Sequence, residues 1–127
     1  MVDFETDIPE DILNFLFELG SEYEFDPVSS IESEKYFLNL IDEFKSLDNS
    51  ELFTALSERV KQDFIALNGV YPDWIQSPDW AFNDGKPMTF IGQLEKDYYK
   101  LDISSAIVFY TFYDKTSGDV KTVVQFD

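Results

Sequence analysis

The chain has 127 residues, of which 26 are acidic and 9 basic, giving a formal net charge of −17. A field of this sign repels nucleic-acid phosphates and anionic membranes, and it speeds encounters with basic partners. Because 17 % of the residues are aromatic, the sequence is not a disordered acidic tail. It contains no cysteine and no histidine, which excludes thiol nucleophiles, imidazole bases and the usual zinc ligand sets.

The negative charge is concentrated in the first half. Residues 1–66 carry 17 acids and 4 bases, whereas residues 67–127 carry 9 and 5. The first 34 residues contain 11 acids and no base before Lys35. No apolar run approaches the roughly 18 residues of a membrane span, and the acidic start lacks the basic residues of a signal peptide. We therefore expect a cytoplasmic protein whose charged binding surface lies in the N-terminal half.

Three amphipathic helices are predicted in residues 1–68. The first begins at Asp7-Ile8-Pro9-Glu10, where an acid, a proline and a glutamate are typical of a helix start, and it ends at Gly20. The second covers about 31–47, and the third begins at the capping sequence Asp48-Asn49-Ser50-Glu51 and ends at Gly69. Their apolar stripes consist of Ile8, Ile12, Phe15, Leu16 and Leu19; Phe37, Leu40, Ile41 and Phe44; and Phe53, Leu56, Val60, Phe64 and Leu67.

The second half changes to the period of strands. Residues 89–94, 106–113 and 121–126 are rich in β-branched and aromatic side chains, and the turn-rich segment 114–119 joins the last two into a hairpin. Helices followed by antiparallel strands favour an α+β fold in which three N-terminal helices pack on a C-terminal antiparallel sheet. We expect a single domain, 1–127, divided into a helical half (1–68) and a half with the tryptophan loop and the sheet (69–127).

Both tryptophans lie in a proline-punctuated segment, residues 69–88, which we name the tryptophan loop. It contains P-D-W-I-Q-S-P-D-W over residues 72–80, and G-K-P-M-T-F-I-G-Q-L follows over residues 85–94. Tryptophans in such a loop either fix it onto the sheet or serve as anchors on a binding surface. The regularity of the loop favours the first role.

These motifs resemble the signature of the YwqG-like family of bacterial proteins. Members of that family show a similar G-G-x-P-x-W-I-Q element, a second proline–acid–tryptophan element and a strand ending in F-x-G-Q. The resemblance covers about residues 69–127, and it includes the aromatic strands 107–114 and 123–127. Val70 replaces the second glycine of the family pattern. The resemblance implies a fold for the C-terminal half, no established enzymatic activity, and relatives that look like immunity proteins encoded beside secreted toxins.

The acidic residues suggest two further kinds of site, a glycoside-hydrolase site and a calcium site, and the sequence favours neither. Asp73 and Asp79 would offer an acid and a base in the manner of a glycoside hydrolase, but acids beside prolines are ordinary turn residues. Asp114, Thr116 and Asp119 surround a glycine, yet they lack the spacing and the final glutamate of an EF-hand. We therefore expect no enzymatic activity, no cofactor and no metal.

The leading functional hypothesis is a cytoplasmic immunity protein or antitoxin that covers a basic surface of a secreted bacterial toxin, such as a nuclease. Nucleic acids and membranes are not expected as partners. The alternatives are a small-ligand or carbohydrate-binding protein or enzyme that uses the tryptophan loop, and a housekeeping protein whose charge keeps it soluble. The predicted partner-binding residues are Glu18, Glu22, Tyr23, Glu24, Phe25, Asp26 and Glu32; those of the alternative ligand loop are Asp73, Trp74, Gln76, Trp80 and Gln93.

Overall fold

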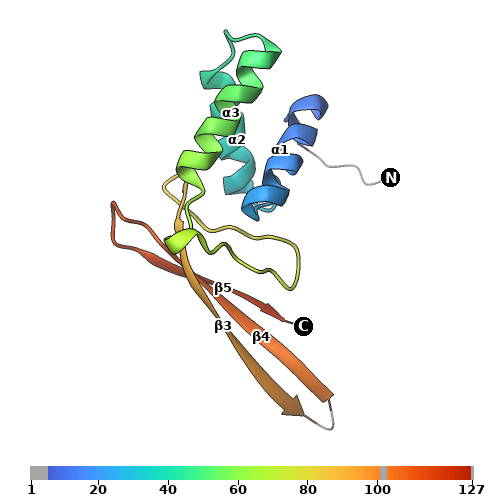
Figure 1. The fold of residues 1–127 in the computed structure, drawn as a ribbon, viewed down its shortest axis with the longest axis vertical. Coiled ribbons are helices and arrows are strands. Elements are labelled where there is room, and N and C mark those ends of the chain that lie inside the picture. Colours follow the sequence, from blue (N-terminus) through green and yellow to red (C-terminus); the bar gives the residue numbers. More distant parts are fainter. Residues whose placement is uncertain (1–5, 101–102, 127) are drawn as a thin grey trace.

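A computed structural model describes residues 6–100 and 103–126, with side chains up to residue 97 and again from residue 106. Three helices precede two antiparallel sheets (Figure 1), which confirms the predicted α+β fold. The elements are α1 (Glu10–Tyr23), α2 (Ile31–Glu43), α3 (Asn49–Asp63), the short 3-10 helix η1 (Leu67–Gly69), β1 (Phe82–Asn83), β2 (Lys86–Pro87), β3 (Thr89–Lys100), β4 (Ile103–Tyr113) and β5 (Val120–Phe126).

Helix α1 runs through Gly20, so the prediction that it ends there is wrong. Glu24 takes the left-handed conformation (φ 63°, ψ 45°) that closes the helix, and the amide of Phe25 donates to the carbonyl of Gly20 at 3.1 Å. This 6→1 bond is the Schellman closure of a helix. A Cβ on Gly20 would lie 2.2 Å from the carbonyl oxygen of Phe25. The glycine is therefore needed for the close return of the chain. The N-cap residue is Pro9, and it makes no side-chain cap bond. The prediction that the acid Asp7 caps this helix is therefore wrong.

The predicted capping box of α3 is confirmed, because the Asp48 side chain accepts from the Glu51 amide at 2.9 Å and the Glu51 side chain accepts in return from the Asp48 amide. Two boundaries differ from the predictions. Helix α2 ends at Glu43, four residues early, and α3 ends at Asp63. Leu67 consequently lies in η1 with its side chain exposed, outside the buried stripe.

The larger sheet has the strand order β3-β4-β5, and all of its pairings are antiparallel. The predicted hairpin over the 114–119 turn is confirmed by bonds between Asp114 and Asp119 and between Gly118 and Asp114. The small β1–β2 hairpin was not predicted. It turns at Asp84-Gly85, where both residues have positive φ, and an Asp-Gly pair is a strong signal for such a turn.

One aromatic core joins the helices to the sheet through the tryptophan loop. Phe64, which follows α3, lies 5.2 Å from Trp80 between ring centroids, and Trp80 lies 5.2 Å from Phe112 on β4. Figure 1 shows this loop between the helices and the strands, with the β3–β4 hairpin extending away from the helices. The loop is therefore the layer through which the two halves pack.

Candidate functional site

Trp80 fixes the tryptophan loop inside the protein. Its side chain is 2 % exposed, and the indole N–H donates to the carbonyl of Met88 at 2.8 Å. A buried tryptophan whose polar group is paired with the backbone has no atoms free for a ligand. This placement favours the structural role for Trp80 that the loop's regularity predicted.

Trp74 connects the tryptophan loop to the first loop, which we define as residues 24–30 between α1 and α2. Its indole N–H donates to the carbonyl of Glu24 at 2.7 Å, and its ring lies 4.3 Å from that of Tyr110. The two loops are separated by 50 positions in the sequence, and this bond holds them side by side. Trp74 is half-buried, so it also acts as a structural anchor.

Glutamines of the loop and of the neighbouring strands join the loop backbone to the sheet. Gln93 accepts from the Asp73 amide at 2.8 Å, and Gln76 donates from its side chain to the carbonyl of Phe126 at 2.9 Å. Gln125 accepts from the Gln76 amide and donates to the carbonyl of Ser77. These bonds occupy Gln76 and Gln93, two of the polar side chains on which the ligand-binding alternative depends. The arrangement favours the scaffold role of the loop.

The first loop is held against α2 by side-chain bonds. The buried Ser33 hydroxyl donates to the carbonyl of Pro27 at 2.9 Å, and the Asp26 carboxylate accepts from the Val28 amide at 2.9 Å. Phe25 is 3 % exposed, and its ring stacks on those of Phe37 and Phe64. The prediction that Phe25 is a surface anchor is therefore wrong, because its ring completes the core.

The joined loops bring carboxylates from both halves of the sequence together. Burial and the nearby Asp73 carboxylate raise the pKa of Glu24, and burial and the nearby Asp26 carboxylate raise the pKa of Asp79. Each pair combines an acid of the first loop with one of the tryptophan loop. Both raised pKa values mean that the folded protein disfavours the ionised forms of Glu24 and Asp79.

We name this surface the acidic seam. Glu22 lies in the last turn of α1, which ends at Tyr23, and the rings of Tyr23 and Tyr71 lie 5.9 Å apart. Burial raises the pKa of both tyrosines, and the charge of Glu22 adds to the effect. Glu32 is exposed in the first turn of α2 and lines a cavity of about 310 Å³ together with Asp79. Glu18 is exposed one helical turn before Glu22. The acidic seam consists of Glu22, Glu24, Asp26, Glu32, Asp73 and Asp79.

Within the described part of the chain, no lysine or arginine forms an ion pair with a carboxylate of the acidic seam. The ion pairs between described residues join Arg59 with Glu43 and Lys45 with Asp42, so none lies within 4.0 Å of a seam carboxylate. Lys121 lies at the rim of the 310 Å³ cavity, but its ammonium donates to the carbonyl of Phe82. A neighbouring cavity of about 440 Å³ is lined by Asp26 and Asp79. Ile31, 84 % exposed, stands beside Glu32. The seam therefore offers uncompensated negative charge next to an exposed apolar side chain.

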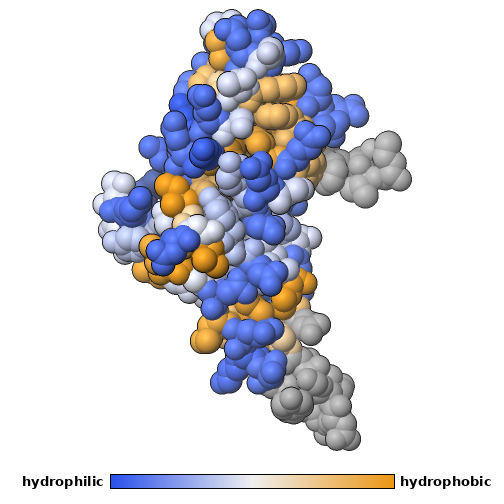
Figure 2. All heavy atoms as spheres, in the orientation of Figure 1, coloured by the Kyte–Doolittle hydropathy of each residue, from blue (hydrophilic) through white to orange (hydrophobic). Residues whose placement is uncertain are grey.

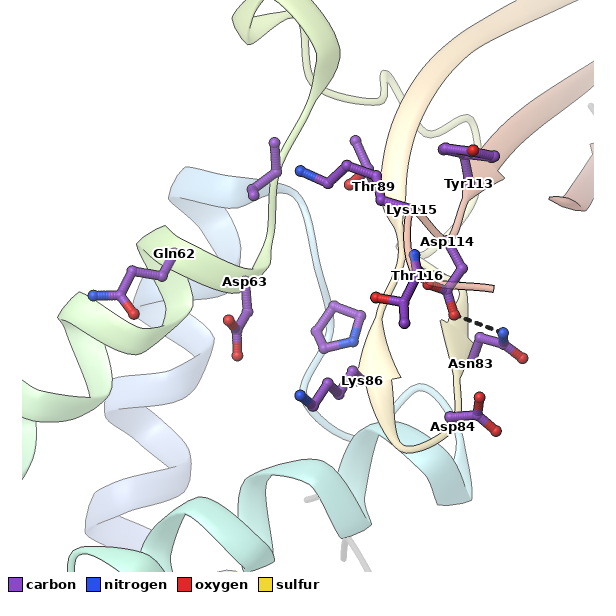
Figure 3. A pocket seen from close by; sticks show the side chains of 12 residues that line it. Gln62, Asp63, Asn83, Asp84, Lys86, Thr89, Tyr113, Asp114, Lys115 and Thr116 are labelled. Atoms are coloured by element: carbon purple, nitrogen blue, oxygen red, sulfur yellow. Dashed lines mark hydrogen bonds between the residues drawn. The ribbon is translucent and has the colours of Figure 1, made fainter. Parts of the chain in front are cut away.

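A third cavity, of about 390 Å³, lies between the end of α3, the β1–β2 hairpin and the β4–β5 turn (Figure 3). Lys86 and Lys115 border it, with Asp63 across from them. Asp63 accepts a hydrogen bond from the buried Tyr36 hydroxyl at 2.5 Å, and burial, followed by this bond, raises the pKa of Tyr36. Because this carboxylate serves a core tyrosine, we interpret it as structural.

Asn83 accounts for the oxygens that resembled a calcium loop. Its amide nitrogen donates to Asp114, Ser117 and Asp119, at 2.7, 3.2 and 3.0 Å. The bond from Asn83 lowers the pKa of Asp114, with the amides of Thr116 and Ser117 also contributing. Among the described residues no group of three or more acids is arranged to hold a metal ion. The turn is therefore closed by an amide.

Comparisons of the chain with protein-family models, curated proteins and solved structures found no match. The class that the coordinates define is an α+β protein with an unneutralised acidic seam between its two halves. Within the described part of the chain, no helix has the length and apolar character needed to cross a membrane. The sequence pattern did not predict the pairing of the two loops, because nothing local relates residues 50 positions apart.

Proposed function

We propose that this chain is a cytoplasmic binding protein of the immunity or antitoxin type, which blocks a toxin by covering the toxin's basic surface with the acidic seam. The observation that carries the proposal is the proximity of Asp73 to Glu24 and of Asp26 to Asp79, which line one cavity. Among the described residues no cation forms an ion pair with these four carboxylates. A cationic partner would relieve a repulsion that the free protein retains. The resemblance of residues 69–127 to the YwqG-like family supports a toxin as the partner.

The charge distribution fits such a role kinetically. A net charge of −17 speeds the approach of a basic protein, since opposite fields raise association rates by factors of about 10 to 1,000. The lifetime of the complex depends on desolvated contacts at the centre of the interface. Ile31 is the exposed apolar residue placed to supply one. We expect the charge of the acidic seam to raise the association rate and the apolar contact of Ile31 to lower the dissociation rate.

The proposed function is tested by calorimetric titration of the purified chain with the product of the neighbouring gene. Four amide substitutions, Glu24→Gln, Asp26→Asn, Asp73→Asn and Asp79→Asn, remove the charge of the central seam with little change of shape and reduce the net charge from −17 to −13. Hen lysozyme serves as a basic protein without cognate contacts, which reports non-specific attraction.

The matched control removes the same charge elsewhere on the surface. It consists of four exposed acids on other elements, substituted as Asp7→Asn, Asp42→Asn, Glu58→Gln and Asp97→Asn. We expect the seam variant to bind at least about tenfold more weakly and with a smaller salt dependence, while the control stays within about threefold of the wild type. Equal losses in both variants, or binding indifferent to salt, would contradict the seam as the binding surface.

The enzymatic and small-ligand alternatives gain no specific support. Four of their five candidate side chains bond to backbone groups: Gln93 to the Asp73 amide and Trp80 to the Met88 carbonyl. Trp74 bonds to the carbonyl of Glu24, and Gln76 to that of Phe126. We therefore propose a role in protein binding without catalysis.

A further inference from the structure

The three-stranded sheet has two faces that differ in charge. Strand register places four rows of side chains on the face turned away from the core, and residues 92, 111 and 122 make up one of these rows. We name this surface the outer face. Its members are Thr89, Gly92, Leu94 and Lys96 on β3; Ile107, Phe109, Thr111 and Tyr113 on β4; and Val120, Thr122, Val124 and Phe126 on β5.

The outer face contains no acid. About one residue in five of the chain is acidic (26 of 127), so twelve surface positions would be expected to hold about two or three. Acids do occur on these strands. Glu95 and Asp97 lie on the other face of β3, and along the strand they alternate with Leu94 and Lys96 of the outer face. The acid-free character is therefore a property of this face and not of strand composition.

The outer face is also largely apolar, and it is uncovered outside its Thr89–Tyr113 end, which lines the cavity of about 390 Å³. None of its seven apolar side chains belongs to the hydrophobic core or packs against it. Leu94, Val120, Val124 and Phe126 are exposed, and on β4 Ile107, Phe109 and Tyr113 are half-buried by their neighbours. Figure 2 shows hydrophobic residues exposed among hydrophilic ones over the strands. Five of the seven apolar side chains form a contiguous apolar patch on two adjacent rows, and the Gly92–Thr111–Thr122 row separates this patch from Tyr113 and Val120. An exposed apolar patch is typical of an interaction site.

We propose that the outer face packs on the outer face of a second copy of this chain. A two-fold interface places one patch on itself, so a patch whose charges are nearly all of one sign opposes like charges. Elsewhere, 26 acids against 9 bases would bring carboxylates face to face. The outer face avoids this cost, and sheets with apolar faces pack well about 10 Å apart. A basic partner is a poorer occupant, because the face has no carboxylate for its cations to meet.

The geometry implies a weak dimer. Four rows on three strands span roughly 20 Å by 14 Å, which is about 280 Å² of flat area on each copy and about 560 Å² from the two copies, smaller than a standard interface. The remaining negative charge of each copy opposes association over a screening length of about 10 Å at 0.1 M salt, which shrinks to about 3 Å at 1 M. Self-association should therefore strengthen with salt, opposite to the binding of a basic partner at the acidic seam.

The test is sedimentation velocity of the full chain at several concentrations up to about 500 µM, in 50 mM and in 1 M NaCl. We expect a monomer–dimer equilibrium whose dissociation constant falls at least about tenfold in the higher salt. Leu94→Glu, at a position 66 % exposed, should abolish the dimer because it places an unpaired carboxylate inside the apolar interface of each copy. The matched control is Val70→Glu, at a position 67 % exposed outside this face, which should still dimerise.

Three outcomes would overturn the proposal: a wild-type chain that stays monomeric in 1 M NaCl, equal loss of the dimer in both variants, or a dimer that survives Leu94→Glu. A monomeric wild type that loses a basic partner through Leu94→Glu would show that the partner covers this face instead. Circular dichroism and urea unfolding establish that both variants are folded. The seam variant of the previous section should dimerise at least as well as the wild type, so the two proposals fail independently.

Discussion

The indole N–H of Trp74 donates to the backbone carbonyl of Glu24 at 2.7 Å, which joins the tryptophan loop to the end of α1 across 50 residues. This bond and the Tyr23–Tyr71 contact hold together the two loops that carry most of the acidic seam. The packing of the two halves therefore also creates the negative surface. Repulsion between Glu24 and Asp73 works against this contact.

Trp74→Phe should keep the ring against Tyr110 and remove the donor to Glu24. We expect a loss of about 1–2 kcal/mol in the free energy of unfolding, because a partly buried carbonyl loses its partner. Urea unfolding followed by circular dichroism measures this change. An unchanged midpoint would show that the bond contributes nothing in solution.

Trp80→Ala should be more damaging, because it empties the centre of the aromatic core. Truncation of a buried tryptophan costs about 3–5 kcal/mol, a large part of the stability of a domain this size. We expect a strongly lowered melting temperature or aggregation. A folded variant with near-native stability would argue that Trp80 is not the structural anchor described here.

Gly20→Ala and Glu24→Gly test the closure of α1 in opposite directions. The added Cβ of the first would lie 2.2 Å from the Phe25 carbonyl oxygen, so we expect destabilisation by about 1–3 kcal/mol. The second relieves a left-handed glutamate and should stabilise by about 0.5–1 kcal/mol. Glu24→Gln separates the two causes, since it removes the charge and leaves the backbone strain. Stabilisation by Gln equal to that by Gly would assign the gain to charge alone.

The acidic seam gives folding stability a distinctive dependence on pH. The pKa values of Glu24 and Asp79 are raised in the folded chain, so between the unfolded and folded pKa the folded state binds more protons. The free energy of unfolding contributed by these groups therefore falls as pH rises through that window. This destabilisation is fully present when the pH is above the pKa values of the folded state, and it is absent when the pH is below those of the unfolded state.

The double variant Glu24→Gln with Asp79→Asn should consequently be more stable than the wild type at pH 7, and the difference should vanish near pH 3. Asp114→Asn should show the opposite sign, because the pKa of Asp114 is lowered and its contribution is present at neutral pH. Thermal melts from pH 3 to pH 8 measure both. A double variant less stable than the wild type at pH 7 would refute the repulsion within the seam.

Asn83→Asp tests the amide that closes the β4–β5 turn. It replaces the donor with a carboxylate beside Asp114 and Asp119, whose oxygens lie 2.7 and 3.0 Å from the present nitrogen. We expect a loss of about 1–3 kcal/mol at pH 7 that is recovered in acid. Asn83→Ala removes the donor without adding charge and should cost less. Equal losses of unfolding free energy in Asn83→Asp and Asn83→Ala would exclude a contribution from charge repulsion.

Local signals in the sequence determined the class of the fold and many of its elements. The Asp48–Glu51 capping box, the change of hydrophobic period and the turn at 114–119 depend on neighbouring residues, so they can be read without the tertiary structure. The Asp84-Gly85 turn also had its signal, although the hairpin around it was not predicted. The acidity of the first half was equally evident from the sequence.

Only the tertiary structure decided which residues meet. Gly20 resembles a helix stop, but it lies within α1 because the returning chain at Phe25 needs its missing Cβ. Phe25 alternates with acids in the sequence as a surface residue would, yet its ring fills the core. The pairing of Glu24 with Asp73, the orphaned charge of the acidic seam and the acid-free outer face all arise from contacts between distant segments. Such contacts depend on packing and strand register, which no local pattern encodes.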